Sequence, residues 1–156
     1  MSVNIINPYN VKLNNVIIRG IGTLKSGEQS EIRDLTVLEV GGGTVSLGYR
    51  SVIGYGSFLQ AKGDITIGDN SLLGPHCSYF ASSHTTKRGY NVRDLPFLRG
   101  KITIKDNVWI GSNCTINKDI VLNNGCVIGA NSFVNKSVPE WEVWGGTPVK
   151  FLKEVE

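Results

Sequence analysis

The sequence has little of what disulfide-bonded and metal-dependent proteins need. It contains three cysteines and two histidines in 156 residues. The cysteines show no CxxC spacing, and an odd number of them favours a reducing compartment over a disulfide framework. A catalytic zinc ion normally takes three protein ligands, which two histidines alone do not supply. We therefore expect no metal site and no disulfide bond.

Long apolar runs and a strong charge of either sign are also missing. No run approaches the roughly 20 residues of a membrane-spanning helix, and the first ten residues, MSVNIINPYN, lack the basic and apolar regions of a signal peptide. A net charge of +3 is too small to indicate a nucleic-acid partner. No GxSxG, Walker or GxGxxG-plus-acid motif appears. We expect a single cytoplasmic domain over residues 1–156, without a membrane span.

What the sequence does have is a period of six. Aliphatic residues recur at every sixth position, without a break in phase, at Ile104, Ile110, Ile116, Leu122, Ile128 and Val134. This period fits neither an amphipathic helix nor an alternating strand. It predicts a parallel β-helix, in which each hexapeptide is one short strand plus a turn and three hexapeptides close a triangular coil. Many of the 19 glycines, together with asparagines, fall at the expected corners, which need left-handed backbone conformations.

The cysteines fit the same pattern. Cys77, Cys114 and Cys126 each follow an aliphatic residue of the six-residue phase by four positions. That second slot of the hexapeptide also faces inward, so we interpret the cysteines as small core residues. A covalent role as nucleophile is therefore not expected.

The period divides the chain into three parts. Residues 47–146 form regular hexapeptide coils, apart from a two-residue phase slip at AKGDIT. Residues 1–46 are predicted to form irregular N-terminal coils, with a separate small β element as the alternative. Residues 147–156 are predicted to form a short C-terminal helix, capped by its threonine and covering the open end of the stack.

One loop interrupts the repeat at about residues 80–101. It carries five basic residues and one acid. Long loops in compact domains are usually functional, although a solvated basic flap is the alternative. His84 lies at the root of this loop, where an imidazole could accept a proton from a substrate hydroxyl. His76 lies at a corner slot that asparagine fills elsewhere, which favours a structural role.

Several motifs in their order resemble one enzyme family. SSH at 82–84, the basic loop, ITIKDNVWIGSNCTI at 102–116, VIGANSFVNKSVP at 127–139 and GGTPVKFL at 145–152 are similar to the hexapeptide-repeat O-acetyltransferases. This group includes the galactoside, maltose, xenobiotic and polysaccharide acetyltransferases. The resemblance implies a left-handed β-helix and a homotrimer with active sites between subunits. It also implies transfer of an acetyl group from acetyl-CoA to a hydroxyl of a sugar or saccharide intermediate, as in polysaccharide biosynthesis.

The resemblance also implies roles for eight residues. His84 matches the general base of the family, and Trp109 matches a tryptophan beside the acyl and acceptor pocket. The other matches are contacts to acetyl-CoA: the pantetheine region at Ser112 and Ala130, the far end of the molecule at Asn135 and Lys136, and its phosphates at Lys150 and Lys153. No metal ligand is implied.

The chain also departs from the family. Thr147 stands where the tail motif usually has asparagine, and the galactoside enzymes have sugar-contacting residues where this chain has the AKGDIT slip. The acceptor therefore stays open between a saccharide and a sugar nucleotide. N-acetylation of an amino sugar nucleotide is the main alternative. A metal-dependent lyase resembling the gamma-class carbonic anhydrases and a non-catalytic scaffold are further alternatives.

Overall fold

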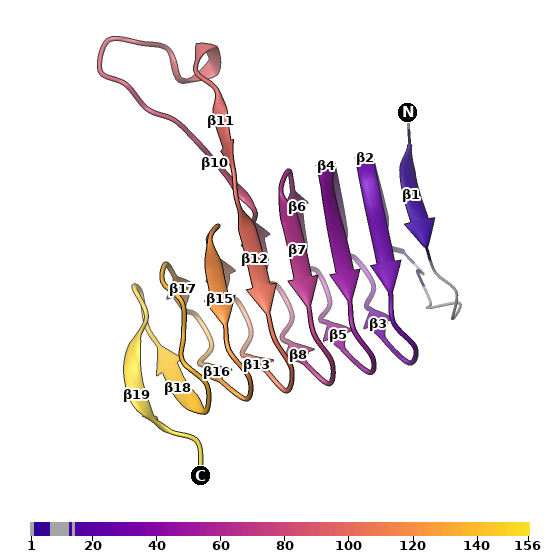
Figure 1. Ribbon diagram of the computed structural model, residues 1–156, viewed down its shortest axis with the longest axis vertical. Helices are drawn as coiled ribbons and strands as arrows, with labels where there is room; N and C mark the ends of the chain where they lie inside the picture. Colours follow the sequence, from indigo (N-terminus) through magenta and orange to yellow (C-terminus); the bar gives the residue numbers. More distant parts are fainter. Residues whose placement is uncertain (1, 7–12, 14) are drawn as a thin grey trace.

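Stacked coils form a three-sided prism with one long flap (Figure 1). The computed structural model describes residues 2–6, 13 and 15–156. Residues 1, 7–12 and 14 lie outside this description, so the predicted irregular coils of 1–46 can be followed mainly from residue 15 onwards. Strands of successive coils pair in parallel, as the six-residue period predicts.

Each side of the prism is one ladder of parallel strands. The first face contains β3 (Glu31–Ile32), β5 (Val52–Ile53), β8 (Leu72–Leu73), β13 (Trp109–Ile110), β16 (Val127–Ile128) and β18 (Glu142–Gly145). The second face contains β6 (Phe58–Ala61), β9 (Ser78–Phe80), β14 (Thr115–Ile116) and β17 (Phe133–Val134). The third face contains β1 (Val3–Ile6), β7 (Asp64–Ile67), β12 (Lys101–Ile104) and β15 (Ile120–Leu122). Two longer strands, β2 (Ile17–Ser26) and β4 (Val37–Leu47), run from the second face into the third.

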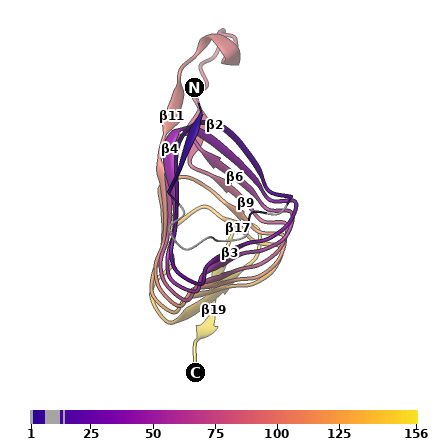
Figure 2. The same cartoon turned by 90° about the vertical axis from the view of Figure 1, so that its right-hand side faces the viewer.

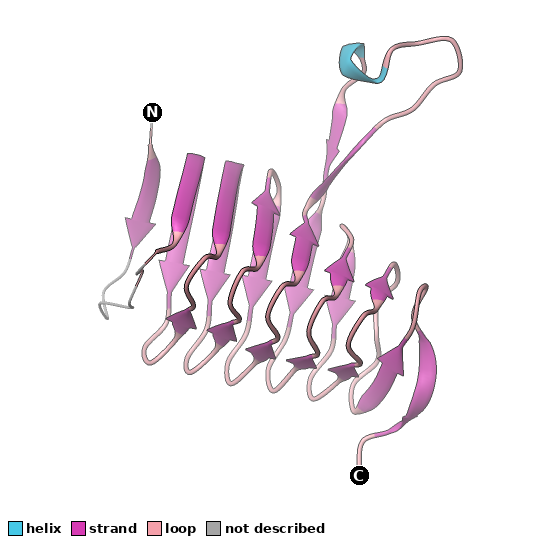
Figure 3. Cartoon of the chain, turned by 180° about the vertical axis from the view of Figure 1, so that it is seen from behind, coloured by secondary structure: helices cyan, strands magenta, loops and turns pink. Residues whose placement is uncertain are grey.

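The coil is left-handed. Figure 2 looks along the prism from its N-terminal end, and the chain descends the third face, crosses the first and climbs the second as it recedes. This anticlockwise course away from the viewer defines a left-handed helix. Figure 3, which views the molecule from behind relative to Figure 1, shows the short strands of the first face stacked in register.

Aliphatic side chains fill the interior of the prism. All six residues of the six-residue phase are buried, as are Leu38, Leu59 and Ile65 in the earlier coils. Each coil alone has too little interior to bury these side chains, so stacking of successive coils creates the core. Apolar burial of this kind stabilises by roughly 25 cal/mol per Å² of surface removed from water.

Two inward-facing ladders of small polar residues accompany the aliphatic core. Ser71 donates its hydroxyl to the Lys105 carbonyl, at 2.8 Å, and accepts the Val108 N–H, at 3.0 Å. Cys77 makes the same two contacts in the second ladder, donating to the Gly111 carbonyl, at 3.2 Å, and accepting the Cys114 N–H, at 3.4 Å. All three cysteines are free and buried, which confirms their interpretation as core residues.

The phase slip is a wider corner between the second and third faces. Leu59 pairs with Leu38, 21 residues earlier, and Tyr79 pairs with Leu59, 20 residues earlier, whereas Val134 pairs with Ile116, 18 residues earlier. The additional residues of the early coils lie at this corner, between β6 and β7 and within β4. We call it the wide corner.

The flap leaves the prism at the wide corner. It consists of β10 (Ser82–His84), the 3₁₀ turn η1 (Val92–Asp94) and β11 (Phe97–Arg99), and β10 and β11 form an antiparallel ribbon. The Gly100 N–H donates to the Ala81 carbonyl at 2.9 Å, so the two ends of the flap meet at its root. The predicted extruded loop is therefore confirmed, and it begins as an ordered ribbon.

The predicted C-terminal helix is wrong. Residues 150–154 form β19 (Lys150–Glu154), which pairs antiparallel with β18. Without this strand, β18 would leave an unpaired sheet edge at the end of the stack, and β19 satisfies its backbone groups. Phe151 also packs edge-on against Trp144, with ring centroids 6.4 Å apart. Thr147 donates its hydroxyl to the Asn131 carbonyl, at 3.1 Å, instead of capping a helix.

Candidate functional site

A groove runs along the corner between the first and second faces. Its volume is about 570 Å³, and it is lined by Gly74, Pro75, Trp109, Ile110, Gly111, Ser112, Val127, Ile128, Gly129, Ala130 and Val143. We call it the corner groove. Most of these residues are apolar, and glycine is the corner residue in three consecutive coils, so backbone forms much of the floor.

The stacking of the coils explains two of the three glycines of the corner groove. A Cβ at Gly111 would lie 2.6 Å from the backbone nitrogen of Ala130, and a Cβ at Gly74 would lie 2.7 Å from the carbonyl carbon of Gly111. Side chains are therefore excluded here by close packing of adjacent coils. The result is a smooth channel with exposed peptide groups.

Three of the sequence-predicted site residues line the corner groove together. Trp109 lies in β13 between Leu72 and Val127, and the residue is 57% exposed. Ser112 and Ala130 follow the corner glycines of successive coils, and both are exposed. A large exposed aromatic ring beside a narrow apolar channel is a common feature of ligand sites.

His84 lies elsewhere in the same chain. It is exposed at the end of β10, opposite Phe97 of β11 in the antiparallel register. The flap leaves from the wide corner, whereas β13 and β16 lie at the far side of the prism (Figure 1). His84 does not line the corner groove.

The predicted contacts near the C-terminus lie outside the corner groove as well. The Lys136 ammonium lies 4.9 Å from the centroid of the Trp144 ring, and the Lys153 ammonium lies 3.5 Å from a carboxylate oxygen of Glu156. Asn135 is exposed after β17, and Lys150 is exposed in β19 opposite Gly145. These four residues form an exposed polar region at the C-terminal end of the stack.

His76 occupies a structural position. Its φ is +57°, close to the values of Asn70, Asn113 and Asn131 at other corners. Its N–H donates to the Tyr55 carbonyl of the preceding coil, at 2.8 Å. The structure thus confirms the interpretation of His76 as a corner residue.

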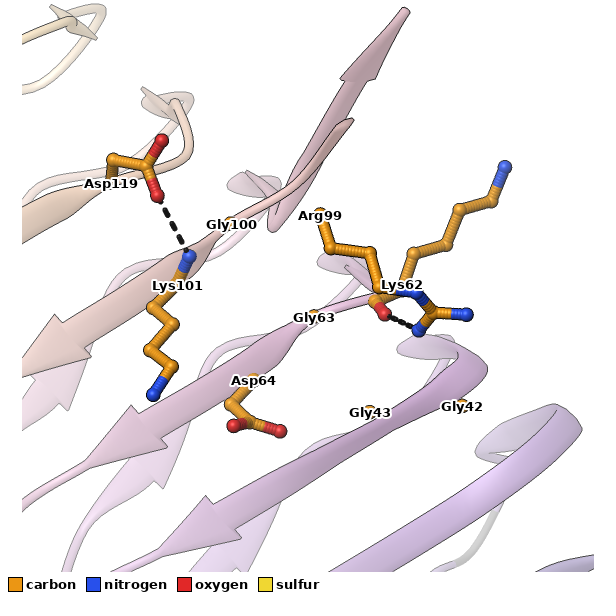
Figure 4. Close-up of a pocket in the computed structure, with 9 residues that line it drawn as sticks. All are labelled: Gly42, Gly43, Lys62, Gly63, Asp64, Arg99, Gly100, Lys101 and Asp119. Atoms are coloured by element: carbon orange, nitrogen blue, oxygen red, sulfur yellow. Dashed lines mark hydrogen bonds between the residues drawn. The ribbon is translucent and has the colours of Figure 1, made fainter. Parts of the chain in front are cut away.

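A second groove was not predicted. It lies at the wide corner beside the flap, has a volume of about 420 Å³, and is lined by Gly42, Gly43, Lys62, Gly63, Asp64, Arg99, Gly100, Lys101 and Asp119 (Figure 4). We call it the basic groove. In the sequence, the AKGDIT slip and the Gly41-Gly42-Gly43 run are the two features that mark the position of this groove. Neither could be interpreted before the stacking placed them next to Arg99.

The described residues contain no group of three or more histidine, cysteine or acidic side chains that could hold a metal ion. Within the same part of the chain, no helix is long and apolar enough to cross a membrane.

Comparisons with known proteins point to one family. Residues 101–136 match the family described as bacterial transferase hexapeptide (six repeats). Galactoside O-acetyltransferase of Escherichia coli K12 is 34% identical over 95 residues, which cover 58% of this chain and 44% of the relative. The chain spans about half the length of several curated relatives that it matches.

Solved structures agree. The hexapeptide-repeat acetyltransferase VCA0836 of Vibrio cholerae, complexed with acetyl-CoA, is 33% identical, with a TM-score of 0.67 over 72% of this chain and 61% of that one. AntD, an N-acyltransferase of Bacillus cereus solved with coenzyme A and an amino sugar nucleotide, shares the fold at 22% identity. Its TM-score is 0.78, over 97% of this chain and 84% of that one. These matches confirm the resemblance to the hexapeptide-repeat acetyltransferases and the β-helical fold.

Proposed function

We propose that this protein is an acetyl-CoA-dependent O-acetyltransferase that acts on a hydroxyl of a sugar or saccharide intermediate. The observation that carries the proposal is the corner groove, in which Trp109, Ser112 and Ala130 lie together. VCA0836, a relative with 33% identity, was solved with acetyl-CoA, and the galactoside enzyme of Escherichia coli is named as an O-acetyltransferase.

The corner groove suits the extended pantetheine arm and acyl end of acetyl-CoA. Its floor of backbone at Gly74, Gly111 and Gly129 leaves room for a pantetheine arm, and Ser112 adds an exposed hydroxyl. The Trp109 ring would cover the acyl end. Asn135, Lys136, Lys150 and Lys153 would contact the nucleotide end of the donor and its phosphates, because they lie exposed beyond the groove towards the C-terminus.

His84 is the proposed general base. It would accept the proton of the acceptor hydroxyl as that oxygen attacks the thioester carbonyl, and would later return the proton to the departing sulfur. Acetyl-CoA supplies the activated acyl group. Proton transfer of this kind typically contributes about 10²–10⁴-fold, and the N–H of Ser112, next to the corner glycine Gly111, would stabilise the developing oxyanion.

A second copy of the chain is needed to complete this site. His84 and the corner groove lie at different corners of the same prism. A cyclic trimer would bring the flap of one subunit to the corner groove of the next. The exposed side chains of Tyr90, Val92 and Leu98 on the flap would then be covered by that neighbour.

The first test measures CoA release from acetyl-CoA with a thiol reagent, across neutral sugars, sugar phosphates and amino sugars. His84→Ala should lower turnover by about 10²–10⁴-fold because the proton acceptor is lost. His76→Asn is the matched control, since asparagine occupies the equivalent corner in the next two coils at Asn113 and Asn131. We expect it to keep full activity. Near-normal turnover of His84→Ala would contradict the assignment.

N-acetylation of an amino sugar nucleotide is the second candidate. AntD shows that the fold accommodates an N-acyltransferase with a dTDP-amino sugar. Matched hydroxyl and amine acceptors in the same assay separate the two reactions. A chain that neither binds acetyl-CoA nor releases CoA with any acceptor would instead be a non-catalytic β-helix protein.

A further inference from the structure

The basic groove has an electrostatic character that the corner groove lacks. Three cationic side chains, Lys62, Arg99 and Lys101, line it together with two carboxylates and a floor of glycines (Figure 4). The glycines are required by packing, since a Cβ at Gly43 would overlap the Gly63 carbonyl and one at Gly63 would overlap the Gly100 carbonyl. The floor is therefore bare backbone, onto which a ligand can approach closely.

The two carboxylates of the basic groove are already engaged. Asp64 accepts the Thr44 N–H at 3.0 Å. Asp119 accepts the Lys101 N–H at 3.2 Å and pairs with the Lys118 ammonium at 2.5 Å. Neither Lys62 nor Lys101 forms an ion pair with any residue that the structure describes. Their charges thus remain available to an anion.

Arg99 is held in place by backbone oxygens. Its Nη1 donates to the Gly41 carbonyl, at 3.1 Å, and to the Lys62 carbonyl. The Lys62 ammonium and the Arg99 guanidinium lie 4.6 and 5.4 Å from the centroid of the Phe97 ring. Phe97 and the two cations therefore form one preorganised cluster, and fixed cations of this kind suit phosphate oxygens.

His84 faces the same side as this cluster. In the antiparallel ribbon, Ser82 lies opposite Arg99 and His84 lies opposite Phe97. Directly opposed residues project to the same face of a sheet, as do residues two apart along a strand. Two strand residues span about 7 Å, so the backbone positions of Arg99 and His84 in the ribbon are separated by about the width of a sugar ring.

We propose that the basic groove binds a phosphate group of the acceptor and thereby presents the acceptor's sugar ring to His84. The acceptor class is then a glycosyl phosphate or a sugar nucleotide, not a neutral saccharide. This inference rests on the proposed function, because it takes His84 to be the general base. It extends that function to residues Lys62, Arg99 and Lys101.

Calorimetric titration tests the inference with pyrophosphate, glucose 1-phosphate and glucose as probes. The native chain should bind the two phosphates and not glucose. Lys62→Gln should weaken phosphate binding by about tenfold or more, since it removes a charge-assisted hydrogen bond, and Lys62→Arg should restore most of it. Lys25→Gln, an exposed lysine of β2 that does not line the groove, is the matched control. Equal binding of glucose and glucose 1-phosphate, or unchanged phosphate binding by Lys62→Gln, would overturn the inference.

A titration with acetyl-CoA separates this inference from the proposed function. If pyrophosphate still binds at saturating CoA, the basic groove is independent of the donor, as expected. Loss of pyrophosphate binding in the presence of CoA would assign the cations to the donor and overturn the inference. Acetyl transfer to neutral sugars without any phosphate binding would agree with the proposed function but refute the inference that the basic groove binds an acceptor phosphate. Failure to bind acetyl-CoA would refute the proposed function itself.

Discussion

Serine, threonine and cysteine occupy equivalent positions in the two inward-facing ladders. The N–H groups of Val52, Leu72 and Trp109 donate to the carbonyls of Ser71, Val108 and Cys126, respectively, so Ser71 and Cys126 belong to the same ladder, with Val108 between them. In the other ladder, Cys77 and Cys114 stand between Ser57 and Ser132. Small residues recur at these positions, and several of them, such as Ser71 and Cys77, hydrogen-bond to the backbone of an adjacent coil. Val108 fills one position by its apolar side chain alone. The small size of cysteine therefore explains the three free, buried thiols.

The burial of Cys126 predicts a specific loss of stability at alkaline pH. Burial raises the pKa of Cys126 from 9.0 to about 12. Between these values the unfolded thiol ionises and the folded thiol does not, so the free energy of unfolding falls as pH rises, by about 1.4 kcal/mol per pH unit. Below pH 9 this contribution is constant. Urea denaturation from pH 8 to 11 would measure the slope.

Cys126→Ser is the matched variant for this prediction. Serine already fills the same ladder position at Ser51 and Ser71, where it hydrogen-bonds to carbonyls of adjacent coils. The variant has no thiol to ionise at position 126, so its stability should fall less steeply between pH 9 and 11 than that of the native chain. Parallel slopes for the two proteins would show that Cys126 does not titrate as its burial implies.

At the scale of elements, the sequence predicts the features that repeat along the chain and misses those that depend on contact with segments distant in the sequence. The β-helix, the inward cysteines, the corner position of His76 and the extruded flap all follow from a local period and its single interruption. Strand β19 was predicted as a helix, because its pairing depends on the open edge of β18 and not on its own residues. The basic groove was missed for a similar reason, since stacking brings Lys62 next to Arg99 from 37 positions away in the chain.

Gly63 at the wide corner and Gly129 in the corner groove should differ sharply in how well they tolerate a side chain. A Cβ at Gly63 would overlap the Gly100 carbonyl at the root of the flap, whereas one at Gly129 would meet its nearest atom at 3.7 Å. Gly63→Ala should therefore lower the free energy of unfolding by about 1–3 kcal/mol, the usual cost of overpacking. Gly129→Ala should change it little. Chemical denaturation of both variants measures this, and equal stabilities would show that the corner relaxes freely.

At the scale of the whole molecule, the proposed active site is divided between two corners of one prism. The corner groove lies between the first and second faces, and the flap with His84 leaves the corner between the second and third. A contact that joins two different surfaces of identical chains is heterologous, and it closes into a ring when the rotation allows. The resemblance to the hexapeptide-repeat acetyltransferases implies a three-fold ring. Each of its sites would then take His84 from one chain and the corner groove from the next.

This arrangement predicts complementation between two inactive variants. His84→Ala removes the base, and Ala130→Trp fills the corner groove without disturbing the core, because Ala130 is exposed and lines that groove. If each site uses two chains, trimers that contain both variants should regain about one third of native activity, because one of the three interfaces combines an intact histidine with an intact groove. If His84 and the groove of the same chain worked together, no mixed site would be intact and activity would stay at the level of the single variants. Co-expression with two affinity tags, followed by the CoA-release assay on doubly purified trimers, distinguishes these outcomes, and size-exclusion chromatography of each variant alone provides the control for assembly.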